Sequence, residues 1–204
     1  MAISLKRGKV EENKEEKENK LLESAFSLFT EKGVKRTSVQ EIARQAGVAK
    51  GTFYLYFKDK YDVQDYLIAK KSKQLLTDAI NSLKDKDITN YSEKIICIMD
   101  YIINEFIDNK LLLKFISKNL SWGVYTDKIK LIMDDSSIGI LDLFEKDIKE
   151  NNLKIANPEV KLFMIIELTS STVFTSITTG KPLPIQEYKK YLYDEIRKML
   201  SEEA

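Results

Sequence analysis

The residues best suited to chemistry in this chain of 204 residues lie in one short segment, residues 49–57. Phe53 and Phe57 are four residues apart, so on a helix they point inward together. The residues left for the outer and flanking faces are Lys50, Gly51, Thr52, Tyr54 and Tyr56. Lysine and tyrosine can bind phosphate oxygens, threonine can meet a base edge, and glycine lets a sugar–phosphate chain approach closely. The segment therefore indicates a helix that binds nucleic acid.

The charge of the chain is concentrated around that segment. Residues 32–60 hold seven cations and two anions, a net charge of +5, in a chain whose total is +1. The cations are Lys32, Lys35, Arg36, Arg44, Lys50, Lys58 and Lys60, and the anions are Glu41 and Asp59. A nearly neutral chain does not attract nucleic acid over its whole surface, so this asymmetry predicts one local phosphate-binding face.

The residue types that most enzymes use for catalysis are scarce. The chain has no histidine, and Cys97 is its only cysteine, which excludes imidazole chemistry, an intrachain disulfide and thiolate zinc sites. The acidic pairs Glu105 with Glu167 and Asp134 with Asp135 remain as acid–base candidates, but no spacing brings further ligands or acids to them. An all-helical enzyme is therefore an alternative that the sequence does not favour, and we expect neither a metal nor a cofactor.

Three short helices are expected to position the segment. Apolar residues recur with helical spacing over residues 21–29 and again over 39–46, and each run is followed by a glycine. The second helix begins at Thr37 and Ser38, each with a glutamine or glutamate three residues later, as in a capping box. The third helix, 49–57, follows after only two residues, which predicts a helix-turn-helix.

The rest of the chain favours long helices, because only seven glycines and three prolines occur and no β pattern is found. We expect helices at about residues 60–83, 91–108, 110–120, 127–150, 157–180 and 185–200. The predicted fold is all-α, with about nine helices. We divide it into a disordered tail (1–18), a helix-turn-helix DNA-binding domain (19–60) and a larger helical regulatory and dimerisation domain (61–204).

Residues 1–18 alternate lysine and glutamate, which is typical of a disordered tail. The alternative is a basic arm that reaches into the DNA minor groove with Lys6, Arg7 and Lys9.

No targeting or membrane segment is predicted. The tail lacks the apolar stretch of a signal peptide, and the least charged long stretch, 162–180, contains Glu167 among several serines and threonines. We therefore expect a soluble, cytoplasmic protein.

Three consecutive stretches resemble the tetracycline-repressor (TetR) family of transcriptional regulators. They are LESAFSLFTEKG (22–33), TSVQEIARQAGV (37–48) and AKGTFYLYFKDK (49–60), which are similar to that family's first helix, its second helix with the turn, and its recognition helix with the entry to helix four. The resemblance implies DNA contacts by Thr37, Ser38, Arg44, Lys50, Gly51, Thr52, Tyr54, Tyr56 and Lys60. Thr37, Ser38 and Lys60 would meet phosphates, while Lys50, Gly51 and Thr52 would lie at the groove.

The resemblance also implies a homodimer joined through the last two long helices, which would bind a palindromic operator and act as a repressor. The last helix has apolar residues spaced by three and four, and the half-helix before it is uncharged and rich in small residues. The residues expected at the dimer interface are Val173, Ile177, Ile185, Tyr188, Leu192, Ile196 and Met199.

A ligand pocket is the usual second function of proteins that resemble this family. Aromatic and soft side chains expected to line it are Phe106, Phe115, Trp122, Tyr125, Met133 and Phe163. Few charges fall in these stretches, so the expected effector is a small apolar or amphipathic molecule. Its binding would shift the fourth helix, which carries Lys60, and release the DNA. The alternatives are an activator, or an adaptor for another protein, without an effector.

Overall fold

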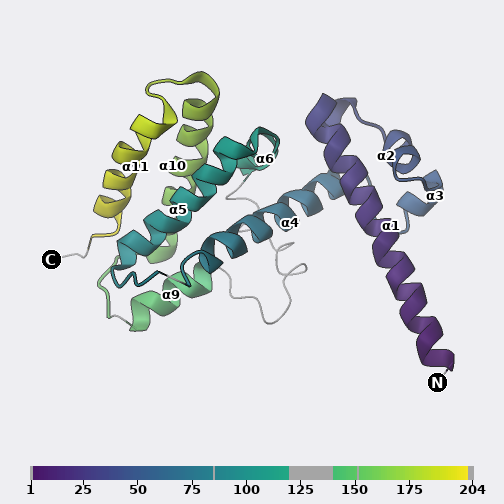
Figure 1. Cartoon of the computed structure of the whole chain (residues 1–204), viewed down its shortest axis with the longest axis horizontal. Coiled ribbons are helices and arrows are strands. Elements are labelled where there is room, and N and C mark those ends of the chain that lie inside the picture. Colours follow the sequence, from purple (N-terminus) through teal and green to yellow (C-terminus); the bar gives the residue numbers. More distant parts are fainter. Residues whose placement is uncertain (1, 85, 120–139, 151, 202–204) are drawn as a thin grey trace. The chain divides into compact units, whose positions relative to one another are not determined.

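The computed structural model describes residues 2–84, 86–119, 140–150 and 152–201. Within these ranges the regular structure is entirely helical, with nine α-helices and no strand (Figure 1). The helices are α1 (Ala2–Lys32), η1 (Val34–Arg36), α2 (Val39–Gln45), α3 (Lys50–Phe53), α4 (Lys60–Asn81), α5 (Tyr91–Asp108), α6 (Lys110–Ile116), η2 (Ser117–Asn119), α9 (Ile140–Glu150), α10 (Pro158–Thr179) and α11 (Ile185–Met199), where η marks a 3₁₀ helix. The predicted all-α fold is confirmed.

The chain forms two compact units, Met1–Leu67 and Ile68–Ala204, which we call unit 1 and unit 2. The boundary between them falls inside α4. It therefore lies further along the chain than the expected domain boundary at residue 60, because the first turns of α4 belong with the preceding short helices.

The core of unit 1 comes from α1, α2 and the segment around α3. Its buried side chains include Leu21, Leu22, Ala25, Phe29, Ile42, Ala43, Phe53 and Phe57. The rings of Phe53 and Phe57 have their centroids 5.8 Å apart, and Phe57 also meets Tyr66 edge to face at 5.8 Å. Buried aromatic rings of this size contribute much of the apolar area of a small core, and here they fix the orientation of α3.

The first helix is longer than expected. Residues 1–18 are predicted to be a disordered tail, whereas α1 begins at Ala2. Alternating lysines and glutamates support a helix through pairs four residues apart, such as Glu16 with Lys20, whose charged atoms lie 2.6 Å apart. The side chains of Lys6, Arg7 and Lys9 lie outside the part of the chain whose side chains the structure describes, so the basic arm stays a prediction.

A reciprocal capping box starts α2. The Ser38 hydroxyl accepts a hydrogen bond from the Glu41 amide at 3.2 Å, and the Glu41 carboxylate accepts one from the Ser38 amide at 2.9 Å. Lys32 of α1 forms an ion pair with the same carboxylate. The pKa of Glu41 is lowered from 4.5 to about 2, because Lys32 and then the amide and hydroxyl of Ser38 donate hydrogen bonds to it. Of the two overlapping capping patterns, the structure therefore uses Ser38 with Glu41.

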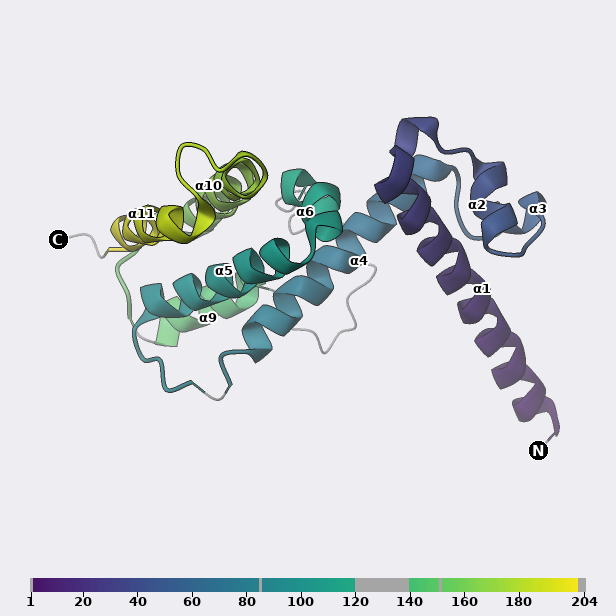
Figure 2. The ribbon, with the colours of Figure 1, turned by 45° about the horizontal axis from the view of Figure 1, so that its top comes forward.

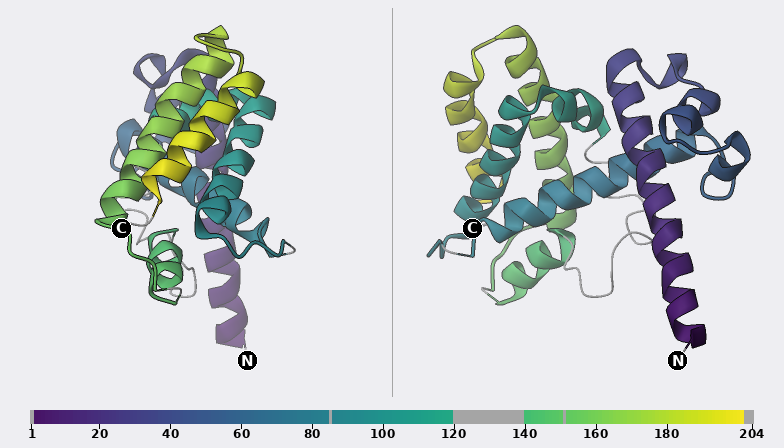
Figure 3. Two further views of the ribbon diagram at one scale, coloured as in Figure 1. Left: turned by 90° about the vertical axis from the view of Figure 1, so that its left-hand side faces the viewer. Right: turned by 45° about the vertical axis from the view of Figure 1, so that its right-hand side comes forward.

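Unit 2 is a helical bundle in which α5 packs on α6, α10 and α11, and α10 packs on α9 and α11. Figures 2 and 3 show α10 and α11 side by side. The interior of the bundle holds Ile95, Ile98, Met99, Ile102, Phe106, Leu162, Ile165, Val173, Leu192 and Ile196. The apolar stripe of α5 is thus the main contribution of that helix to the core.

Polar contacts fix α11 against α5. The Asp100 carboxylate accepts hydrogen bonds from the Lys189 ammonium at 2.6 Å and from the Tyr193 hydroxyl at 2.5 Å. Arg197 donates to both carboxylate oxygens of Glu93, at 2.7 and 3.2 Å. A paired arginine and carboxylate hold a defined geometry, so these contacts set the register between the two helices.

Helix α10 is long and apolar enough to cross a membrane by length and composition alone. Its apolar side chains Leu162, Ile165 and Val173 are instead buried against the other helices of unit 2. This helix begins with Pro158 after Asn157 and ends at Gly180, whose φ is 68°. Both ends match the sequence prediction, and the burial accounts for only part of the apolar composition, because Val160, Phe163 and Met164 of the same helix are exposed.

Candidate DNA-binding surface

The segment 49–57 is held by its inward aromatic residues and presents the opposite side to solvent. Helix α3 itself covers only Lys50–Phe53, but hydrogen bonds from the Leu55 amide to the Thr52 carbonyl (3.2 Å) and from the Phe57 amide to the Phe53 carbonyl (3.0 Å) continue the helical turn. The expected helix over 49–57 is therefore an α-helical turn followed by tighter turns.

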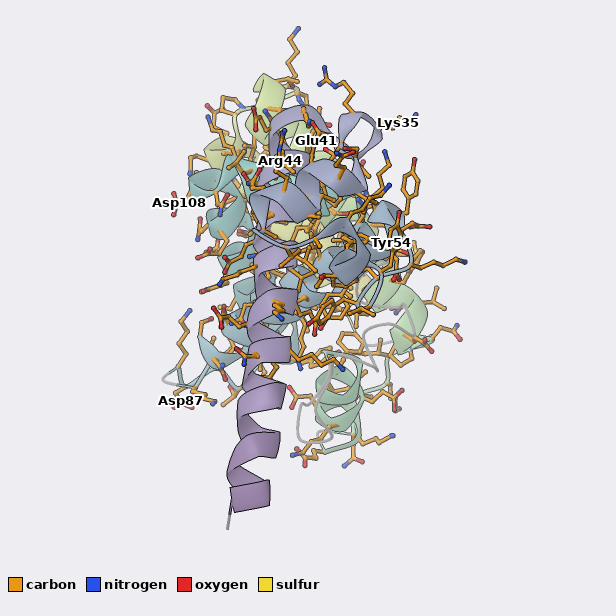
Figure 4. All side chains as sticks on the ribbon, turned by 90° about the vertical axis from the view of Figure 1, so that its right-hand side faces the viewer. Lys35, Glu41, Arg44, Tyr54, Asp87 and Asp108 are labelled. Carbon is orange, nitrogen blue, oxygen red and sulfur yellow. The ribbon has the colours of Figure 1, made fainter. Side chains whose placement is uncertain are left out.

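The outer side of this segment is formed by the residues that the sequence placed there. Lys50, Gly51 and Tyr54 are exposed, with 53% of Tyr54 accessible to solvent, while Thr52 and Tyr56 are half-buried. In Figure 4, which looks onto α2 and α3, Tyr54 extends from the end of α3 and Arg44 from α2. An aromatic hydroxyl, a threonine and two cations thus share the exposed side of unit 1.

Gly51 has no structural need to be glycine. A Cβ added at this position would meet nothing within 4 Å, and its φ is not in the left-handed region. A residue without a side chain at the start of an exposed helix allows close approach of a partner from outside. The position therefore fits contact with a sugar–phosphate chain better than a requirement of the fold.

Thr37 does not belong to the exposed surface. Its side chain is only 1% accessible, and its hydroxyl donates hydrogen bonds to the carbonyl oxygens of Gly33 at 3.0 Å and Leu28 at 3.5 Å. The proposed phosphate contact by this side chain is therefore corrected: Thr37 fastens the segment between α1 and α2. Ser38 is exposed, but its hydroxyl donates to the Glu41 carboxylate at 2.8 Å.

Lys60 stands at the start of α4 and already has two partners. Its ammonium donates hydrogen bonds to the carbonyl oxygens of Lys35 at 3.0 Å and Thr37 at 2.8 Å. An ammonium group has three donors, so one remains for a phosphate. Lys60 therefore connects α4 to the segment before α2, in addition to any contact with DNA.

Sequence reasoning missed several exposed residues beside these. A hollow of about 460 Å³ in unit 1 is lined by Lys35, Arg36, Thr37, Ser38, Val39, Asp59, Lys60 and Tyr61. The cations Lys35 and Arg36 are exposed there, and they were counted in the charge but not assigned contacts. Leu55 was also missed, although it is 79% exposed, because only polar side chains of the segment were considered.

These features define unit 1 as a helix-turn-helix DNA-binding domain: two short helices joined by a glycine turn, with a basic and aromatic outer face. Residues 21–66 match the family model of bacterial regulatory proteins of the tetR family. Residues 21–66 are thus a DNA-binding domain of the tetR type, and the chain is a DNA-binding transcriptional regulator of the helix-turn-helix class.

Similar proteins extend the likeness over most of the chain. An HTH-type transcriptional regulator of Staphylococcus aureus (strain USA300) is 29% identical over 181 residues, which is 88% of this chain and 92% of that protein. A TetR family regulator of Marinobacter aquaeolei shares the fold with a TM-score of 0.67 at 16% identity, covering 95% of this chain and all of that one. The regulator FadR of Bacillus subtilis, solved with stearoyl-CoA, has a TM-score of 0.61 at 20% identity, covering 89% of this chain and 98% of that one.

The residues expected to line a ligand pocket differ in their exposure within unit 2. Phe106 and Phe115 are buried, but Phe163 is 44% exposed. Trp122, Tyr125 and Met133 lie outside the described residues. A groove of about 380 Å³ lies elsewhere, and it is lined by Ile80, Leu83, Lys84, Lys86, Asp87, Ile88, Lys94, Ile95, Ile98, Phe144 and Asp147.

Several residues expected at a dimer interface lie inside unit 2 instead. Val173, Leu192 and Ile196 are buried, because the apolar stripes of α10 and α11 pack within their own chain. Ile177, Ile185, Tyr188 and Met199 are half-buried. The exposed large apolar side chains of these two helices are Val160, Phe163, Met164 and Tyr191. Periodicity identified the apolar stripe, but it does not distinguish a core from an interface.

Proposed function

We propose that this chain is a cytoplasmic repressor that binds a palindromic operator as a homodimer and is released by a small apolar or amphipathic effector. The observation that carries the DNA-binding part is the outer side of residues 49–57. Lys50 and Tyr54 are exposed there, beside Gly51, a position that the fold does not require to be glycine. The buried side chains of Phe53 and Phe57 fix the inner side of the same segment. Such a surface places donors for phosphate and base edges on a rigid support.

A homodimer is supported by the exposed apolar side chains of α10 and α11. Val160, Phe163 and Met164 follow one another at helical spacing near the start of α10, and Tyr191 is exposed on α11. We propose that two copies bury this apolar face of α10 against each other. A two-fold axis would place two recognition segments about one turn of DNA apart, roughly 34–36 Å, or further, and so require a palindromic site.

An effector site is supported by the groove at the end of α4. Ile80 and Leu83 line it together with Ile95 and Phe144, and its volume of about 380 Å³ is that of a small-molecule site. Stearoyl-CoA in the FadR structure is an amphipathic ligand of the same class as the effector proposed here.

The groove suggests a route from ligand to DNA. Helix α4 begins at Lys60 in unit 1, and its last turn contributes Ile80 to the groove in unit 2. We propose that an effector displaces α4 and so changes the separation of the two recognition segments. A coupling free energy of about 1–3 kcal/mol would lower DNA affinity roughly 5–150-fold.

An adaptor or activator without an effector remains the alternative. The adaptor would need an exposed apolar surface away from the dimer helices. In the described ranges, half of the exposed large apolar side chains lie on α10 and α11, which favours self-association.

The test is binding of the purified chain to the DNA immediately upstream of its own reading frame, compared with shuffled DNA of the same composition. The proposal expects saturable binding of two chains per duplex, loss of preference in Tyr54→Ala, and repression of a reporter placed behind that DNA. Equal affinity for both duplexes together with an unaffected reporter would contradict it. A reporter that is activated would favour the alternative.

A further inference from the structure

Leu55 is the most exposed of the large apolar side chains described in the chain, with 79% of its surface accessible. Single exposed leucines are common on protein surfaces, so exposure alone carries no function. Leu55 lies two residues after the buried Phe53, within residues 49–57, whose outer side is the candidate DNA-binding surface. This position gives its exposure a role that can be tested.

Two further residues of the same segment, Ala49 and Thr52, also carry methyl groups. The Thr52 amide donates to the Ala49 carbonyl at 2.9 Å, and the Leu55 amide donates to the Thr52 carbonyl at 3.2 Å. These bonds join the three residues along the backbone at intervals of three. Ala49 and Leu55 are exposed and Thr52 is half-buried, and we refer to the methyl groups of these three residues as the aliphatic stripe.

The aliphatic stripe limits which bases the segment can recognise. It offers methyl groups and a single hydroxyl, so it cannot satisfy the paired hydrogen-bonding groups of guanine. In the major groove, thymine alone among the four bases presents an apolar group, its C5 methyl. We infer that the aliphatic stripe, and Leu55 above all, recognises thymine methyl groups in each half of the operator. This inference rests on the proposed function of unit 1.

Cations beside the aliphatic stripe supply the sequence-independent part of binding. Lys50 and Arg44 are exposed on the same domain and have no side-chain partner among the described residues. Phosphate contacts set the register of a protein on DNA but carry no sequence information. Leu55 therefore contributes to specificity, whereas phosphate contacts by these cations contribute to the general affinity.

The test removes the C5 methyl group of single thymines in the DNA and changes nothing else. The full-length chain is used to select its preferred duplex from a random library, and each thymine of that duplex is then replaced in turn by deoxyuridine. Pairing is unchanged, and the C5 methyl is lost. The inference expects affinity to fall about fourfold per buried methyl at one or two positions of each half-site. At the same positions, the deoxyuridine effect in Leu55→Ala should fall below twofold.

The control variant is Leu111→Ala, which truncates a leucine that is 51% exposed on α6. It should keep both the affinity and the full deoxyuridine effect. Sequence-specific binding that is indifferent to deoxyuridine at every thymine, or that keeps the whole effect in Leu55→Ala, would overturn the inference and leave the proposed function standing. Selection of no preferred duplex would instead overturn the proposed function, and this inference with it.

Discussion

At the scale of single residues, Lys60 and Thr37 show why a residue type does not by itself define a role. The resemblance to TetR proteins implied phosphate contacts for both. In the structure, the Thr37 hydroxyl is buried against the backbone, and two of the three Lys60 donors are used within unit 1. By contrast, the inward position of Phe53 and Phe57 could be predicted, because burial follows directly from apolar residues at helical spacing.

Lys60→Met should destabilise the protein before any DNA is added. The methionine keeps the aliphatic stem but loses hydrogen bonds to the Lys35 and Thr37 carbonyls, which costs about 1 kcal/mol. For a chain of this size the thermal midpoint should fall by about 2–4 °C. Lys58→Met is the control, since the Lys58 side chain is exposed and without a described partner. Equal midpoints for the two variants would show that the Lys60 hydrogen bonds do not contribute.

At the scale of helices, the elements with strong periodicity or clear caps were predicted almost to the residue. The start and end of α5 match the expectation of 91–108, because Asn90 caps its first turn and its apolar stripe is continuous. The segment 49–57 was predicted as one helix but is α-helical only over Lys50–Phe53. The residues after Phe53 form turns instead, but the Phe57 amide still donates to the Phe53 carbonyl at 3.0 Å, so the predicted inward position of Phe57 is kept.

The capping box of α2 predicts a defined dependence on pH. The pKa of Glu41 is about 2 in the folded chain against an ordinary value of 4.5. The carboxylate therefore stabilises the fold above pH 4.5, and this contribution is lost as the pH falls towards 2. Glu41→Gln should melt below the wild type at neutral pH, and the difference should shrink over that window.

The control for this measurement is Glu23→Gln, which changes an exposed glutamate of α1. Its melting temperature should track that of the wild type over the same pH range. A constant difference between Glu41→Gln and the wild type across the whole range would mean that the capping box does not depend on the charge of Glu41.

At the scale of the whole molecule, the sequence correctly predicted a DNA-binding unit followed by a larger helical unit, but not which face of the larger unit is exposed. Both α10 and α11 have apolar stripes, and the residues singled out from them include Val173 and Leu192, which are buried in their own chain. Only the packed structure shows that Val160 and Met164 are left outside. Which apolar residues lie in the core depends on the angle between packed helices, and that angle cannot be predicted from one sequence.

Met164→Glu should disrupt the proposed dimer without unfolding the chain. Met164 is 50% exposed, so a charge there is tolerated in one copy but is buried between two. Sedimentation should change from dimer to monomer at micromolar concentration, with weaker binding to DNA. The control is Leu111→Glu, which adds the same charge at a leucine of α6 that is similarly exposed. An unchanged dimer in Met164→Glu would exclude this face of α10 as the interface.

The central claim is that the outer side of residues 49–57 binds DNA phosphates and bases. The most direct measurement is the dependence of affinity on salt concentration for wild type, Lys50→Ala and Lys114→Ala, with the DNA upstream of the reading frame. Lys114 is an exposed lysine of α6 and serves as the control. Each lost phosphate contact lowers the slope of log affinity against log salt by about one. Lys50→Ala should therefore lower it by about two in a dimer, and Lys114→Ala should leave it unchanged. A slope in Lys50→Ala equal to that of the wild type would contradict the claim.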